Sequence, residues 1–194
     1  MEYVKVKVDG LRPGLLLKRF PDGDLENTSK VQKGEKGTPR EQAEAGLYKD
    51  DKGIIGVPSQ MFFSAMMEAG RDLKIGKRQN STKTSSLLPA GLAIEEIFLP
   101  LKTPKPWEVD SRRVVPATGG GTVSVISYRP RFDEWSVEFT LSIDTEIFTK
   151  EIARQLLDMA GKRQGIGCYR PNRKGPFGRF VVTEWKEQKK SKAA

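Results

Sequence analysis

Two stretches of the sequence alternate between apolar and polar residues, one near the N-terminus and one in the last third of the chain. Tyr3–Val8 reads YVKVKV, and Trp135–Ile143 reads WSVEFTLSI. A period of two residues is typical of a β-strand with one buried face. The pattern predicts two strands, each with every second residue on one face: Val4, Val6 and Val8 in the first, and Trp135, Val137, Phe139, Leu141 and Ile143 in the second.

Two further segments carry apolar residues at helical spacing, roughly Ser59–Lys74 and Thr149–Ala160. Strands are also expected at about 93–99 and 180–185, and Leu15–Leu17 is expected to continue the first strand. Without its insertions the chain then runs strand, helix, strand, strand, helix, strand. This order predicts an α+β, ferredoxin-like (RRM-like) βαββαβ core. Unrelated enzymes share that order, so the fold alone does not assign a function.

The insertions divide the chain into a core and its additions. A length of 194 residues fits one domain, expected over residues 1–185. Within it, residues 21–40 are polar and predicted to form a flexible loop. Residues 103–133 contain a triple glycine and are predicted to form an inserted β-hairpin. A charged tail follows at 186–194.

The chain is strongly basic, with 34 Lys and Arg against 25 Asp and Glu, a net charge of +9. That balance favours a polyanionic partner, and the alternative is a basic but inert surface. The sequence has one cysteine and no histidine, which argues against a disulfide, a zinc site and histidine catalysis. No apolar run approaches a membrane span and no signal peptide is visible. These features predict a soluble, cytoplasmic protein without cofactor, metal or membrane partner.

Residues 161–179, GKRQGIGCYRPNRKGPFGR, combine six basic residues with five glycines and no acid. Glycine lets a backbone approach a ligand closely, and exposed N–H groups with arginines can hold phosphates. Tyr169 and Phe177 are candidates for stacking on bases. The alternative is a plain connection with glycines at its turns. The inserted hairpin repeats the charge pattern, because its two halves carry four arginines and residues 111–132 contain no acid. The alternative to a binding role is that the hairpin is an ordinary one, exposed to solvent.

Three short motifs in the glycine loop resemble one family. Gly165-Ile166-Gly167, Arg173-Lys174-Gly175 and Phe177-Gly178-Arg179, followed by a last strand, are similar to the C-terminal glycine-rich loop of the RAMP superfamily, the CRISPR-associated RNA-binding proteins. Ile55–Ser59, which leads into the helix that ends at Glu68–Arg71, resembles the opening of that family's first helix.

The resemblance implies a subunit that binds guide or CRISPR RNA along its phosphate backbone. Copies of the chain, or sister subunits, would then pack side by side in a ribonucleoprotein of antiviral defence, with the hairpin as a projecting thumb. RNA-cleaving members usually use a histidine, so its absence here implies the non-catalytic, backbone-forming type. A phage- or plasmid-borne relative of the family is an alternative, so membership of a CRISPR complex does not follow.

The predicted nucleic-acid site combines the loop, the hairpin and residues near the first strand and helix. Its members are Lys18, Arg19, Arg71, Arg112, Arg113, Arg129, Arg131, Lys162, Arg163, Gly165, Gly167, Tyr169, Arg170, Arg173, Lys174, Gly175, Phe177, Gly178 and Arg179. One alternative is a phage structural or assembly protein, or a single-stranded DNA-binding protein. Another is metal-dependent RNA cleavage by Asp22 or Asp24, although an Asp in such a loop commonly serves the turn itself.

Overall fold

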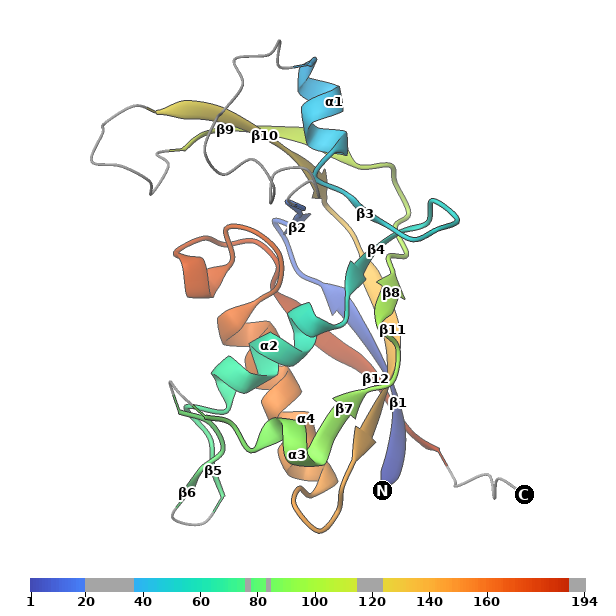
Figure 1. Cartoon of the computed structure of the whole chain (residues 1–194), viewed down its shortest axis with the longest axis vertical. Coiled ribbons are helices and arrows are strands. Elements are labelled where there is room, and N and C mark those ends of the chain that lie inside the picture. Colours follow the sequence, from blue (N-terminus) through green and yellow to red (C-terminus); the bar gives the residue numbers. More distant parts are fainter. Residues whose placement is uncertain (20–36, 76–77, 83–84, 115–123, 189–194) are drawn as a thin grey trace.

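A computed structural model describes residues 1–19, 37–75, 78–82, 85–114 and 124–188 (Figure 1). Its centre is a four-stranded antiparallel sheet in the order β12-β1-β11-β7. The strands are β1 (Glu2–Gly10), β7 (Leu92–Ile94), β11 (Ser136–Ile143) and β12 (Phe180–Gln188). Helices α2 (Gln60–Ala69) and α4 (Lys150–Met159) lie together on one face of this sheet. Chain order and strand order together confirm the ferredoxin-like fold.

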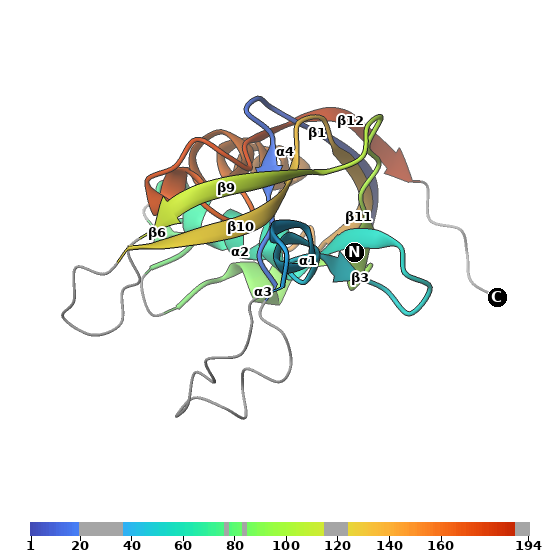
Figure 2. The same cartoon turned by 90° about the horizontal axis from the view of Figure 1, so that it is seen from above.

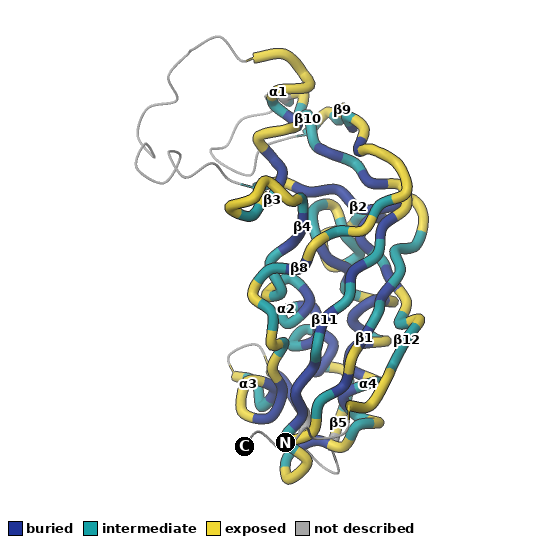
Figure 3. Tube along the Cα trace, turned by 90° about the vertical axis from the view of Figure 1, so that its right-hand side faces the viewer, coloured by how far each residue is buried: buried dark blue, intermediate teal, exposed yellow. Residues whose placement is uncertain are grey.

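The core lies between this sheet and the two helices, where the alternating runs place their apolar residues. Val4, Val6 and Val8 are fully buried, as are the predicted inward positions of β11 (Figure 3). The Phe62 ring of α2 packs 5.4 Å from that of Phe139 and 5.1 Å from that of Phe180, measured between centroids. At the start of α4, the Thr149 hydroxyl accepts a hydrogen bond from the Ile152 N–H at 3.3 Å.

Two predicted elements are shorter than expected. The strand expected at 93–99 is divided into β7 and β8 (Phe98–Pro100), and β8 joins a second sheet with β4 (Ile55–Pro58) and β3 (Tyr48–Lys49). The Glu96 carboxylate accepts the Thr140 N–H at 2.8 Å and so takes the place of further pairing with β11. Helix α2 ends at Ala69, after which the N–H groups of Arg71 and Asp72 donate to carbonyls only three residues earlier. The chain then forms the β5 (Lys74–Ile75) and β6 (Arg78–Gln79) hairpin, across which the Leu73 carbonyl accepts the N–H of Asn80.

The inserted hairpin is present as β9 (Glu108–Val114) and β10 (Val125–Phe132) and projects to one side of the molecule (Figure 2). The structure corrects one prediction here. Leu15–Leu17 does not continue β1; Leu15–Leu16 forms β2, which pairs with β10 in a third sheet. The chain leaves β1 through Gly14, whose φ of +103° favours glycine. Helix α1 (Pro39–Glu44) packs against the hairpin, and α3 (Leu88–Gly91) precedes β7.

Parts of the predicted loop and tail lie outside the described residues, namely 20–36 and 189–194, and so does the hairpin tip at 115–123. Residues 39 and 40 already belong to α1, and β12 extends to Gln188. The division into a domain of 1–185, a loop, a hairpin and a tail stays a prediction. Of the helices in the described ranges, none has the length and hydropathy required to cross a membrane.

The aromatic cluster of the core gives a first prediction. Replacing Phe62 with Ala removes a fully buried ring that contacts both central and edge strands, so we expect a loss of about 3–5 kcal/mol in the free energy of unfolding. Ile97→Ala is the control, because Ile97 is 88% exposed and its loss should change stability by less than about 0.5 kcal/mol. Urea denaturation followed by circular dichroism measures both, and equal losses would contradict the packing described.

Candidate nucleic-acid interface

The glycine loop between α4 and β12 is a folded structure with its own turns. It begins with a π-helical turn, η2 (Ala160–Gln164), and contains a 3-10 turn, η3 (Pro171–Arg173). Gly165, Gly167 and Gly178 have φ values of +67°, +72° and +73°. At Gly178 a side chain would also overlap the carbonyl oxygen of Ile166, so the position requires glycine for space as well as for conformation.

The backbone N–H groups of this loop are mostly used within the protein, which corrects the expectation of an exposed anion-binding concavity. The N–H of Ile166 donates to the Gly178 carbonyl at 2.9 Å, and that of Phe177 donates to the Tyr169 carbonyl at 3.1 Å. The N–H groups of Gly165 and Gly175 likewise donate to carbonyls of the same region. Phosphate contacts at this loop must therefore come mainly from side chains.

Strand β2 lies between the loop and the hairpin and bonds to both. Its Leu16 carbonyl accepts the N–H of Cys168 at 2.8 Å, and the Gly14 carbonyl accepts the N–H of Gly178 at 2.8 Å. On its other side Leu16 pairs with Arg131 of β10. Two basic segments that are far apart in the sequence are thereby held next to one another.

The hairpin and the loop together line a surface cavity of about 430 Å³, called here the arginine cavity. Its lining residues are Arg112, Arg113, Val114, Arg129, Tyr169 and Arg173. None of these described lining residues is acidic. Arg113 donates to the Ser124 hydroxyl at 2.5 Å and Arg129 donates to the Ser127 hydroxyl at 3.2 Å, contacts that orient the side chains without cancelling their charge. Planar guanidinium groups so arranged suit the oxygens of a phosphate.

Of the two aromatic residues predicted to stack on bases, the structure leaves one accessible. Tyr169 lines the arginine cavity and is 41% exposed. Phe177 is only 3% exposed, because its ring packs inward beneath the Arg112 guanidinium. Phe177 is therefore not accessible to a base in this structure, and its ring supports the loop instead.

Arg112 differs from the other arginines of the cavity because it is paired with a buried acid. Asp110, which is 6% exposed, accepts from the Arg112 Nε at 2.5 Å and from its Nη2 at 3.0 Å. This hydrogen bond raises the pKa of Arg112 above its usual value. Sequence reasoning missed Asp110, although residues two apart on a strand share a face and the spacing alone could have indicated the pair.

A second cavity of about 440 Å³ lies against the same loop and against the first turn of α2. Lys18, Gly167 and Arg170 line it, together with the unpredicted residues Tyr48, Pro58, Gln60, Met61, Ser64, Ile166 and Cys168. Arg170 donates to the Gly167 carbonyl at 2.7 Å. Burial, and then the charge of Arg173, lower the pKa of Arg170, and burial raises the pKa of the Cys168 thiol. This cavity has basic and apolar walls, and none of its described lining residues is acidic.

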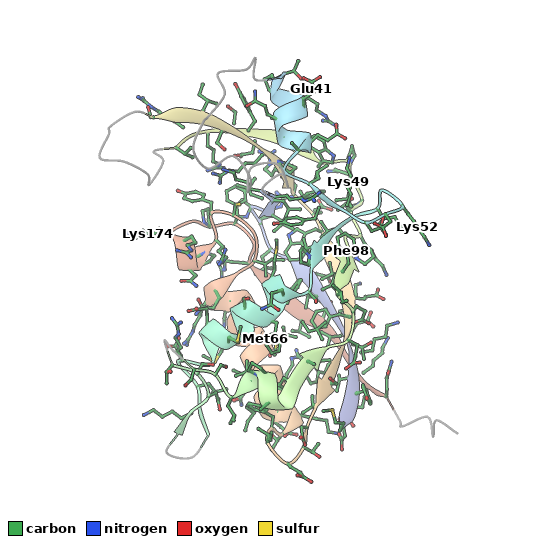
Figure 4. All side chains as sticks on the ribbon, viewed as in Figure 1. Glu41, Lys49, Lys52, Met66, Phe98 and Lys174 are labelled. Atoms are coloured by element: carbon green, nitrogen blue, oxygen red, sulfur yellow. The ribbon has the colours of Figure 1, made fainter. Side chains whose placement is uncertain are left out.

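The remaining predicted cations divide into paired and unpaired groups. Arg71 is bound to Glu68 at 2.7 Å, Arg163 to Asp72 at 3.5 Å, and Arg131 to both Glu108 and Asp133 at 2.6 and 2.8 Å. Neutralised in this way, these three are weak candidates for phosphate contact. By contrast, the described acids form no ion pair with Lys162, Arg179 or Lys174, which directly follows the η3 turn (Figure 4).

The remaining residues of the predicted site line neither of the two cavities. Arg179 is half-buried, and its Nε has no hydrogen-bond partner among the described residues. Arg19 is also half-buried, and its N–H donates to the Gly46 carbonyl at 2.9 Å. Gly175 packs against Tyr169. Asp22 and Asp24 lie outside the described residues, and no group of metal-ligating side chains occurs within the described ranges.

The face of the main sheet opposite the helices, which is turned toward the viewer in Figure 3, carries charged residues of both signs. Glu138 of β11 pairs with Lys5 and Lys102, Asp9 with Lys7, and Glu184 with Lys186. Four lysines and three carboxylates thus largely cancel on this surface. A sheet-surface mode of nucleic-acid binding is therefore less well supported than binding at the arginine cavity.

The tight approach at Gly178 gives a second prediction, with Gly53 as its matched control. Both have positive φ, but no atom of the described residues lies within 4 Å of the position of a side chain at Gly53. Gly53→Ala should cost about 1–2 kcal/mol of unfolding free energy for the backbone conformation alone. Gly178→Ala should cost about 3 kcal/mol or more, because the backbone of Ile166 must also move. Equal losses of unfolding free energy for the two variants, measured by urea denaturation, would contradict the prediction, because they would mean that the Ile166 backbone moves at no energetic cost.

Comparison with known proteins adds a fold relationship. No protein-family model matches the sequence, and no curated protein is significantly similar to it. Among solved structures, it resembles a chain of the "Cryo-EM structure of the Type III-B Cmr-beta bound to cognate target RNA", with a TM-score of 0.57 at 11% identity. The match covers 97% of this chain and 61% of the other, so this chain spans less than two thirds of that neighbour's length. At this identity the likeness establishes a shared fold.

Proposed function

We propose that this chain binds single-stranded RNA through its phosphate backbone, with the arginine cavity as the main contact. The observation that carries the proposal is the convergence of the hairpin and the glycine loop on one cavity with four arginines and no acid among its described lining residues. Arg113, Arg129 and Arg173 would contact phosphates. Tyr169 would stack on a base, a contact that does not depend strongly on sequence.

The RNA would be a guide or CRISPR RNA, and the chain would assemble side by side with copies of itself or with sister subunits. Two observations support this part of the proposal. The loop motifs resemble those of the RAMP superfamily, and the fold resembles that of a chain from a complex that is bound to target RNA. We propose a non-catalytic role, since the sequence contains no histidine to serve as a general base.

Removing the three arginines of the cavity that form no ion pair with a described acid tests the phosphate contacts. We expect the Arg113→Ala, Arg129→Ala, Arg173→Ala triple variant to bind a poly-uridine oligonucleotide more weakly and with less dependence on salt. Each lost phosphate contact lowers the slope of log K against log salt by about 0.7 for single strands, so the slope should fall by about 2. Fluorescence anisotropy at several salt concentrations measures both quantities.

The matched control is the triple variant Lys5→Ala, Lys102→Ala, Lys186→Ala. It removes three lysines from the face of the main sheet opposite the helices, called here the open face. It changes the net charge equally but leaves the cavity intact, so its slope should stay close to that of the unaltered chain. Equal slopes for the two triple variants would mean that binding depends on overall charge alone. Parallel titrations with deoxyuridine oligonucleotides decide between RNA and the alternative of single-stranded DNA binding.

Two alternatives have their own tests. For a phage structural or assembly protein, the oligomer seen on a sizing column would be unaffected by nuclease, whereas our proposal expects co-purifying RNA and a nuclease-sensitive assembly. For metal-dependent cleavage, incubation of bound RNA with Mg²⁺ would give products that disappear in the Asp24→Ala variant. We expect intact RNA in both proteins.

A further inference from the structure

The Asp110–Arg112 pair fixes the orientation of one guanidinium group in the arginine cavity. Its two hydrogen bonds, 2.5 Å from Nε and 3.0 Å from Nη2, hold the guanidinium in a defined plane. The two charges cancel locally, and two of the guanidinium nitrogens are occupied. Arg112 is therefore less suited to phosphate than Arg113, Arg129 or Arg173, which form no ion pair with a described acid.

The guanidinium held in this way lies over two rings of the glycine loop. Its central carbon is 4.6 Å from the centroid of Phe177 and 5.3 Å from that of Tyr169. Both distances are within the range of a cation–π contact. Phe177 is buried and Tyr169 is partly exposed. Arg112 therefore contacts both a buried ring of the loop and the ring that is accessible to solvent.

The backbone of Tyr169 is also held from the loop side. Its φ is +48°, uncommon for a residue with a side chain, and its carbonyl accepts the N–H of Phe177 at 3.1 Å. Gly175 packs so closely that any side chain there would overlap the Tyr169 carbonyl. These contacts fix the backbone position of Tyr169, and the contact with Arg112 restricts the orientation of its ring.

We propose that Asp110 is a positioning residue, which through Arg112 holds the Tyr169 ring as a platform for one nucleobase at the arginine cavity. This inference rests on the RNA binding proposed above. Asp110 itself does not touch the nucleic acid. A ring that is ordered before binding loses less side-chain freedom when a base stacks on it, which improves affinity without an added phosphate contact.

A simpler role for Asp110 predicts the opposite result. If the carboxylate only cancels the charge of Arg112, its removal frees that arginine for phosphate. The Asp110→Asn variant would then bind RNA more tightly and with a steeper salt dependence. If Asp110 positions Tyr169, the same variant binds more weakly, and its salt dependence does not change.

The experiment is a double-mutant cycle of Asp110→Asn and Tyr169→Ala, with the same oligonucleotide and anisotropy assay. We expect Tyr169→Ala to weaken binding about tenfold. Asp110→Asn should weaken it about fivefold with an unchanged salt slope, and by less than twofold when Tyr169 is already Ala. Asp133→Asn is the matched control, since Asp133 pairs with Arg131, which does not line the cavity. It should change affinity by less than twofold.

Four outcomes overturn the inference: tighter binding by Asp110→Asn, unchanged binding by that variant, a changed slope, or a full fivefold effect that persists without Tyr169. Should Asp110→Asn not fold, Arg112→Lys replaces it, because lysine keeps the charge but lacks the planar guanidinium, and the same non-additivity with Tyr169→Ala is expected. If the unaltered chain binds RNA and Asp110→Asn binds equally well, this inference alone fails. If the unaltered chain does not bind RNA, the proposed function fails and this inference fails with it.

Discussion

The candidate site depends on the three-residue segment Gly14–Leu16, which is bonded on two sides. The glycine loop donates to the carbonyls of Gly14 and Leu16, while β10 pairs with Leu15 and Leu16. Gly14, Leu15 and Leu16 are themselves buried, and these backbone hydrogen bonds hold the segment from both sides. Without it, the hairpin and the loop would be two separate basic surfaces. With it, arginines from β9, β10 and η3 surround one cavity.

The placement of charge explains why one basic surface is a better candidate than another. Many cations of this chain are matched by nearby carboxylates, including those on the open face of the sheet and Arg131 on the hairpin. Arg113, Arg129 and Arg173 are not matched in this way among the described residues. Holding like charges near one another carries an electrostatic cost in the free protein, and a bound polyanion would relieve it.

The sequence was sufficient for the core of the fold and for the identity of the two basic segments. Alternation in β1 and β11 and helical spacing around Phe62 are local patterns, and local patterns predict which residues are buried. The pairing of β2 with β10 was missed because it joins residues more than a hundred positions apart, and a two-residue strand has no period of its own. The burial of Phe177 was missed for the same reason, since Arg112, which lies over its ring, belongs to another element.

The glycine loop shows what composition alone cannot distinguish. Its glycines suggested N–H groups that are free to hold an anion, but in the structure they allow close packing of the loop on itself and on β2. Glycine serves both purposes, and only the partners of the neighbouring N–H groups separate them. Of the basic side chains of the loop, Lys162, Arg163, Arg173 and Lys174 are exposed, whereas Arg170 and Arg179 are half-buried.

Ultraviolet cross-linking of the chain to a poly-uridine RNA, followed by mass spectrometry of the peptides, tests the location of the interface most directly. Our account predicts adducts on Tyr169 and on peptides from β9, β10 and the glycine loop, with few on the open face of the sheet. Cross-links concentrated on β1 and β11 would contradict it, because they would place the RNA on a surface whose charges are already paired.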